Sequence, residues 1–186
     1  YTAPQVSLNP YYVQLPQCSI TSNPYGGATG TYDLLGCLAI QHGGVWAVIR
    51  FYEPPGGEGT ILGFASGQYP NRASSYTSWA YAGTNGYIDL GDYPFNIFGL
   101  PLTPGWHTLV FGEYYSGGTY YLVAYLDTPN NAASESTTST PQLFGEYGPF
   151  PYGDIGTGFT LNWPYANNGW FFFNGVIAYV ALYPGS

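Results

Sequence analysis

The sequence predicts an all-β protein, a sandwich or a barrel, and three observations lead to this fold class. Roughly ten short segments rich in β-branched and aromatic residues recur at intervals of about ten residues. Turn-forming residues separate them, with 27 Gly and 16 Pro in 186 residues. No segment shows the sustained 3.6-residue apolar period of an amphipathic helix. The length suits one domain with a full core.

The strongest strand patterns lie at five places in the chain. They cover residues 45–52, 60–66, 106–112, 119–127 and 175–183. Shorter or less regular patterns cover residues 75–81, 87–90, 95–98, 159–162 and 170–173. The turn Ser116-Gly117-Gly118 lies between two strong segments, so we expect residues 106–127 to form a β-hairpin. Residues 128–141 are polar, offer nothing to a core and are expected to form a loop.

Charge is scarce, and its sign excludes several classes of partner. Only 6% of residues are charged, the net charge is −8, and Arg50 and Arg72 are the only Lys or Arg side chains. A nucleic-acid site needs clustered basic residues, which this chain cannot supply. No apolar stretch reaches the ~20 residues of a membrane span, so membrane insertion is not expected. The chain begins at Tyr1 rather than Met, and we expect that an export signal was removed from an extracellular protein.

Cys18 and Cys37 are the only cysteines. In an exported chain two such residues are expected to form a disulfide, although two buried free thiols remain an alternative. A disulfide here would tie the N-terminal part of the chain to the first half of the domain.

The first seventeen residues differ from the rest and suggest a division into an extended segment, 1–17, and one sandwich domain, 18–186. The segment is uncharged, contains three prolines, and carries apolar residues that could fill pockets, namely Val6, Leu8, Tyr12 and Val13. It could lie on its own sheet as an N-terminal strand. Alternatively, residues 4–15 could add to a sheet edge of a neighbouring copy. Transfer of a strand from copy to copy produces an open polymer unless its rotation closes a ring.

The order of the segments from about residue 27 to 183 resembles the laminin-G-like and concanavalin-A-like jelly-roll superfamily. The motifs that match are VWAVIRF, GTILGFAS, GYIDLG, LTPGWHTLVF, YYLVAYLD and FNGVIAYVALY. The resemblance implies an antiparallel jelly-roll β-sandwich with an extended N-terminal strand segment. It leaves the function open, because members of this superfamily include lectins, adhesion modules and glycosidases.

Glycoside hydrolysis requires two carboxyl groups on either side of a bound sugar. The Glu-x-Asp-x-x-Glu-like strand of laminarinase-type relatives does not occur in this sequence. The remaining candidates are Glu113 at the end of a strand and Glu146 in a loop, and we expect Glu113 to face solvent. His107 is expected to be a hydrogen-bonded strand residue, and His42 has no nucleophile signature around it. We therefore expect no catalytic residues and no enzyme.

Two binding sites remain possible. Carboxylates in or near loops could hold a calcium ion at the rim of the sandwich, namely Asp89, Asp92, Asp127 and Asp154. We expect no other cofactor. Exposed aromatic rings could stack on sugars, and the candidates near turns are Trp79, Trp163 and Trp170. Trp46 and Trp106 are expected to pack in the core.

Three functions follow from these observations. The first is a non-enzymatic subunit of an extracellular filament or coat, whose partners are copies of itself. The second is a lectin-like carbohydrate-binding module, and the third is a glycoside hydrolase. The first uses the uncharged N-terminal segment and the scarcity of charge, and it requires no catalytic pair. It is therefore the function that the sequence favours.

Overall fold

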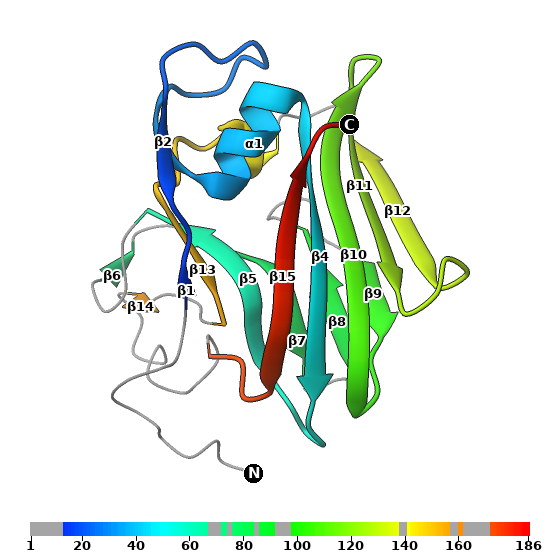
Figure 1. The fold of residues 1–186 in the computed structure, drawn as a ribbon. Helices are drawn as coiled ribbons and strands as arrows, with labels where there is room; N and C mark the ends of the chain where they lie inside the picture. Colours follow the sequence, from blue (N-terminus) through cyan, green and yellow to red (C-terminus); the bar gives the residue numbers. More distant parts are fainter. Residues whose placement is uncertain are drawn as a thin grey trace.

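The computed structural model describes residues 13–66, 72–73, 76–83, 86–91, 98–137, 141–156, 160–161 and 172–186. Two antiparallel β-sheets lie face to face, and their inward side chains form the main core (Figure 1). The prediction of an all-β antiparallel sandwich is confirmed.

The first sheet has six strands in the order β1-β13-β5-β7-β8-β9. Their bounds are β1 Val13–Gln14, β13 Tyr152–Ile155, β5 Gly59–Ala65, β7 Tyr76–Gly83, β8 Tyr87–Leu90 and β9 Phe98–Pro101. Every residue of β5 is buried, because this strand lies in the middle of the sheet beneath the facing sheet.

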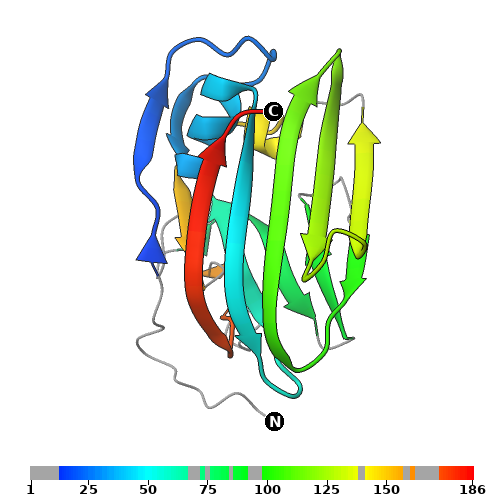
Figure 2. The same ribbon diagram turned by 45° about the vertical axis from the view of Figure 1, so that its right-hand side comes forward.

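The second sheet has five strands in the order β12-β11-β10-β4-β15 and runs the length of the molecule (Figure 2). Their bounds are β12 Ala132–Thr137, β11 Thr119–Leu126, β10 Gly105–Ser116, β4 Gly44–Glu53 and β15 Val176–Pro184. Ser116 pairs with Thr119, which confirms the predicted hairpin. Two small pairs complete the strands: β2 Gln17–Ile20 with β3 Gly30–Asp33, and β6 Arg72–Ala73 with β14 Thr160–Leu161.

A two-residue period divides the long strands into inward and outward sides. In β11 the inward residues Tyr120, Leu122, Ala124 and Leu126 are buried, while the residues between them are partly exposed. In β4 the same alternation runs from Val45 to Glu53. Because successive side chains of a strand point to opposite faces, this period fixes which residues meet the core.

Two elements depart from the expectation. A helix, α1 Leu34–His42, covers one end of the sandwich, where the sequence showed no helical period. Asp33 begins it, since its carboxylate accepts a hydrogen bond from the Leu35 amide, and Gly43 ends it with a left-handed backbone at φ 79°. The predicted loop 128–141 contains the edge strand β12, which pairs with β11 through the backbone and needs no large apolar side chain.

The predicted disulfide is present: Cys18 of β2 is bonded to Cys37 of α1. It fastens the N-terminal part of the described chain to the helix. Ile20, Tyr32, Cys37 and Ile40 form a small second core around it. The nine-residue helix α1 is too short to cross a bilayer, and the described residues contain no candidate membrane span.

Candidate assembly site

Among the described residues, the two sheets contact each other along one side of the sandwich more than along the other. Edge strands β9 and β12 contact each other on the first side. On the opposite side β15 contacts β4 and α1, and no comparable contact joins it to β1 or β13 in the part of the chain that the structure describes. Figures 1 and 2 show β15 and β1 running along this side, with α1 across one end.

The core-facing side chains of β15 are less buried than those of the neighbouring strand. Its inward side chains Ile177, Val180 and Leu182 pack against the main core but remain partly exposed. No residue of β15 is fully buried, whereas β4 beside it buries every inward residue. Three aliphatic side chains that face the core are therefore only partly covered.

The backbone of β15 is equally open. Across residues 13–186, as far as they are described, its ladder is formed with β4 alone, so its other edge offers backbone donors and acceptors to a further strand. A register shift between Ile177 and Tyr179 marks a bulge, and Ala178 within it is exposed. We call β15 with its three partly covered inward side chains the open edge.

Val13 was predicted to lie in the assembly strand, and the structure corrects this. Val13 pairs with Ile155 and Gln14 with Asp154 of the same chain, and the amide of Leu15 donates to the carbonyl of Gly153 at 2.8 Å. Residues 13–17 therefore belong to the body of the subunit rather than to an extended segment ending at residue 17. Val6, Leu8 and Tyr12 lie outside the described residues.

Glu113 was expected to face solvent, and it is instead fully buried between the sheets. Its Oε2 accepts a hydrogen bond of 3.1 Å from the indole nitrogen of Trp79 on the facing sheet. Trp79, a candidate sugar platform, is likewise fully buried. The burial of Glu113 could have been predicted from the two-residue period of its strand, because Glu113 is in phase with the inward residues Leu109 and Phe111.

The two candidate catalytic residues, Glu113 and Glu146, do not form a pair. Glu113 is sealed in the core, while Glu146 is exposed in the turn after a short 3₁₀ helix, Gln142–Phe144. The pKa of Glu146 is raised, because the effect of burial exceeds the opposing effect of a hydrogen bond with Tyr147. A substrate could reach one of these carboxyl groups but not the other.

His107 is hydrogen-bonded within the strand region, as predicted. Its Nδ1 lies 2.7 Å from Asp127 Oδ2 and its Nε2 lies 2.6 Å from the carbonyl oxygen of Thr103. Glu53, also buried, lies nearby, and burial raises its pKa to about 7 against the lowering effect of His107. His42 is exposed at the last position of α1.

Two further buried carboxyl groups lie near the start of helix α1. Asp33 and Asp154 are both buried, and desolvation raises the pKa of each to about 7. Backbone hydrogen bonds lower the pKa of Asp33, and the charge of Asp154 raises it further. Within the described structure, Asp33 Oδ2 and both carboxyl oxygens of Asp154 have no hydrogen-bond partner. Folding therefore favours the protonated form of both carboxyl groups.

The candidate calcium ligands that the structure describes do not form a cluster. Asp89 lies on β8, Asp154 on β13, and Asp127 follows β11 of the other sheet, while Asp92 lies outside the described residues. No group of three or more His, Cys, Asp or Glu side chains gathers in the described part of the chain. Trp163 and Trp170, the other candidate sugar platforms, also lie outside it.

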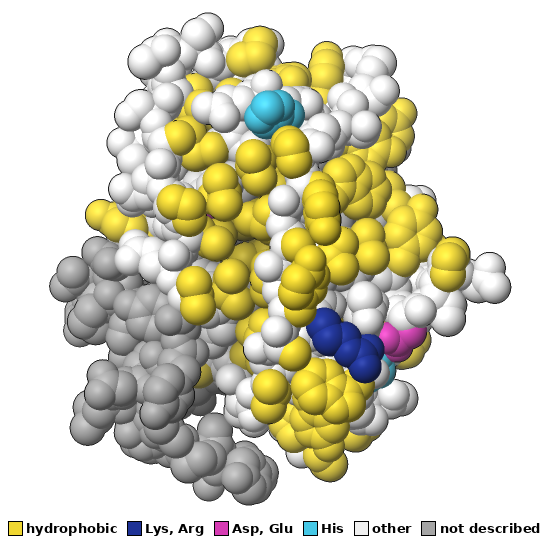
Figure 3. Space-filling view, in the orientation of Figure 1, with side chains coloured by type: hydrophobic (Ala, Val, Ile, Leu, Met, Phe, Trp, Pro, Cys, Tyr) yellow, Lys and Arg dark blue, Asp and Glu magenta, His cyan; other side chains and the backbone are white. Residues whose placement is uncertain are grey.

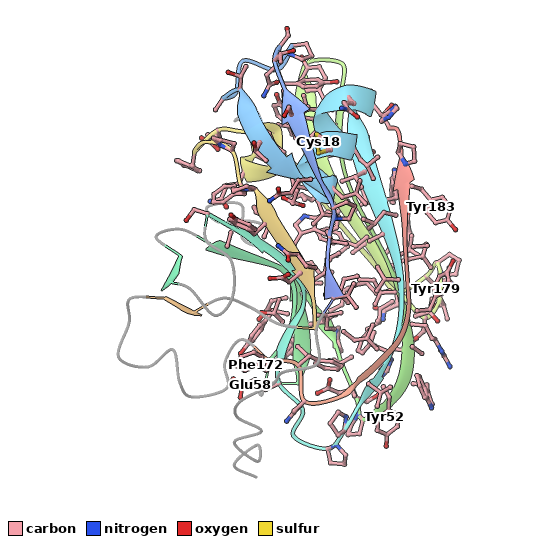
Figure 4. The ribbon with its side chains drawn as sticks, turned by 60° about the vertical axis from the view of Figure 1, so that its left-hand side comes forward. Cys18, Tyr52, Glu58, Phe172, Tyr179 and Tyr183 are labelled. Carbon is pink, nitrogen blue, oxygen red and sulfur yellow. A yellow bond between two sulfur atoms is a disulfide. The ribbon has the colours of Figure 1, made fainter. Side chains whose placement is uncertain are left out.

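Two tryptophans expected in the core lie on the outside of the five-stranded sheet. Trp106 is 49% exposed, and Trp46 is partly exposed. Both are in phase with outward residues of their strands. Figure 4 shows Tyr179 and Tyr183 pointing away from the sandwich on the same side as Tyr52.

Comparisons with known proteins give a likeness of fold. No family model matches the chain, and no curated protein matches it in sequence. Two solved structures of the sialidase NanB, one of them described as from Streptococcus pneumoniae, match at a TM-score of 0.53 and 14% identity. They cover 93% and 96% of this chain, which spans about a quarter of the sialidase, 26% and 27% of its length. At this identity the match supports a shared β-sandwich architecture.

Proposed function

We propose that this protein is a non-enzymatic extracellular subunit of a surface filament or coat, joined by addition of residues 4–12 of one copy to the open edge of the next. The observation that carries the proposal is the partial exposure of Ile177, Val180 and Leu182, three core-facing side chains on an edge strand. Fully burying an exposed aliphatic side chain stabilises by about 1.5–3 kcal/mol, and completing the burial of these partly covered side chains contributes a part of that, so the edge favours an apolar strand.

Residues 4–12, the donor segment, have the pattern that such an edge needs. Val6, Leu8, Pro10 and Tyr12 alternate with polar residues up to Asn9, so one side of an extended segment is apolar. The donor segment has nine residues, and β15 also has nine. The segment carries no charge, so its insertion buries no ionised group.

The length of the donor segment allows a neighbouring copy to act as the acceptor. β1 fixes Val13 to the subunit's own β13, and twelve residues precede it. A twelve-residue extended chain spans about 40 Å. The donor segment uses nine of these residues, about 30 Å, and directly precedes Val13, so the accepting edge must belong to a copy that adjoins β1. Repetition of this join gives a polymer.

Two further observations support this function. The disulfide between Cys18 and Cys37 is typical of exported proteins. Of the two candidate catalytic carboxyl groups, one is buried in the core and the other is exposed. This difference supports a function other than glycoside hydrolysis.

Mixing two full-length variants tests the join directly. One carries Leu8→Cys in the donor segment and the other carries Val180→Cys on the inward side of β15. We expect a short bifunctional thiol reagent to link the two different chains. Ser7→Cys and Ala181→Cys are matched controls, because each places the thiol on the opposite side of its strand. Absence of linkage between the two different chains, or equal linkage of the controls, would overturn the proposal.

A further inference from the structure

The outward side of the five-stranded sheet is unusually apolar for a surface. Alternate residues of β15, β4, β10 and β11 form this outer face, and its middle is made by Val48, Val110 and Val123. An antiparallel sheet with one face on the core ordinarily presents polar side chains on the other. Figure 3 shows hydrophobic side chains gathered over this part of the molecule.

Aromatic rings on the outer face are packed against one another. The ring of Trp46 lies over Gly112, where an added Cβ would come within 2.3 Å of it. Tyr114 stacks on Trp46 at 5.7 Å, and Tyr121 stacks on Tyr114 at 5.3 Å. Rings already held in place lose little conformational freedom on binding, so such a row favours association.

Charge on the outer face is nearly absent. Arg50 is the one charged side chain at an outward position of these four strands, and it stacks over Trp106 and bonds to Thr108 Oγ1 at 3.0 Å. Asp127 lies at the border, where its Oδ1 accepts from the Thr108 amide. The protein has a net charge of −8, so two copies repel each other least where they approach through a face with little charge, such as this one.

The outer face also has a shape that suits its own copy. A hollow of about 260 Å³ lies on it, lined by Thr108, Val110, Tyr125, Asp127, Thr128 and Pro129. The half-exposed ring of Trp106 lies on the same face. In a two-fold pair each copy offers the same surface, so the exposed part of the ring on each copy can contact the hollow on the other.

The area is sufficient for such a pair. Four strands about 4.8 Å apart, with nine residues each at about 3.4 Å, cover roughly 600 Å². Two copies would together bury about 1,200 Å², the lower end of the range for specific protein interfaces.

We infer that the outer face binds the outer face of a second copy of this chain, so that subunits associate side by side. This contact is separate from the open edge, and it does not require the donor segment. If the subunits also join end to end, the pairing makes bundles of filaments.

Full-length protein with one additional cysteine tests the pairing. Val110→Cys lies on β10, the middle strand of the sheet, and we expect a short bifunctional maleimide to link two copies through it. Thr21→Cys, exposed in the connection between β2 and β3, is the control and should give little linkage. Equal linkage at both positions would overturn the inference.

A charge on the outer face should raise the dissociation constant of the pair at least tenfold, as measured by analytical sedimentation. In electron micrographs it should reduce any bundles to single filaments. Val110→Glu supplies this charge, and Thr21→Glu is the matched control. Trp106→Ser removes a half-exposed ring of the face, together with its contacts to Arg50 and Tyr52. Unchanged association of both face variants would contradict the inference. So would loss of binding to a polysaccharide in these variants with self-association unaltered, because the face would then be a glycan site.

Discussion

Trp79 and Glu113 join the two sheets through a hydrogen bond of 3.1 Å in the centre of the core. Both side chains are fully buried, and the indole ring also packs against Phe111 at 4.2 Å between ring centroids. A polar contact in this position requires one particular arrangement of the sheets, because a shift of either strand would leave a buried donor without its acceptor.

Replacing Glu113 should affect stability according to whether an acceptor remains. Glu113→Gln keeps a side-chain carbonyl for the indole N–H and should fold normally. Glu113→Leu leaves that N–H unpaired and should lower the free energy of unfolding by about 1–3 kcal/mol relative to Glu113→Gln. Urea unfolding followed by tryptophan fluorescence measures the difference. Equal stability of the two variants would show that the hydrogen bond contributes nothing.

Purified protein should not hydrolyse β-glucans, xylans or sialosides. The reason is that Glu113 is enclosed between the sheets and cannot reach a sugar, so it cannot act together with the exposed Glu146 on a bound substrate. Reducing-sugar release and release of sialic acid are the assays, with Glu113→Gln and Glu146→Gln as matched variants. Activity that either variant abolishes would show that the protein is an enzyme.

Stability should be highest in acid and fall as the pH rises from about 4 to about 7. Asp33 and Asp154 have folded-state pKa values of about 7, above the ordinary value near 3.8, so folding favours their protonated forms. Their contribution is complete below the unfolded pKa and is lost as the pH passes the folded pKa, by a few kcal/mol for Asp33. Thermal unfolding across this range measures the loss.

Asparagine at these two positions separates titration from structure. Asp33→Asn retains a good helix cap and carries no titrating proton, so it and Asp154→Asn should flatten the pH dependence. Glu58→Gln, at the other end of the molecule, is the control and should leave the profile unchanged (Figure 4). A wild-type profile that rises toward neutral pH would show that these carboxyl groups are ionised in the folded protein.

Loss of the disulfide should lower stability by about 3 kcal/mol, the loop-closure value for a separation of 19 residues. The double variant Cys18→Ala and Cys37→Ala should therefore melt at a lower temperature than the oxidised protein. Reduced wild-type protein should match the double variant, and adding reductant to the variant should change nothing. A melting temperature that reduction leaves unaltered would contradict this expectation.

The long strands could be predicted from the sequence because their alternation is a local property. Residues 45–52 and 119–127 fall within a residue or two of β4 and β11. Helix α1 was missed because it is apolar on several sides, with Leu35, Cys37 and Ile40 all buried. Its better signals were the capping residues, Asp33 before it and Gly43 after it.

The candidate sites were harder to predict, because they depend on which strands meet. Alternation places Glu113 on the inward side of β10, but only the facing sheet explains its burial against Trp79. The exposure of Trp106 follows from the same phase. The open edge could not be predicted from residues 175–183 alone, since that segment reads like any buried strand until its neighbours are known.

The bulge at Ala178 bears on the regularity of any polymer built through β15. Pairing with β4 changes register between Ile177 and Tyr179, so an incoming strand meets two differently phased stretches rather than one uniform ladder. A slip by one residue would turn the apolar side of the strand outward, and a slip by two would misalign it with the bulge. With only one register allowed, every subunit would be displaced from the previous one by the same axial step. A long polymer would therefore have one constant repeat.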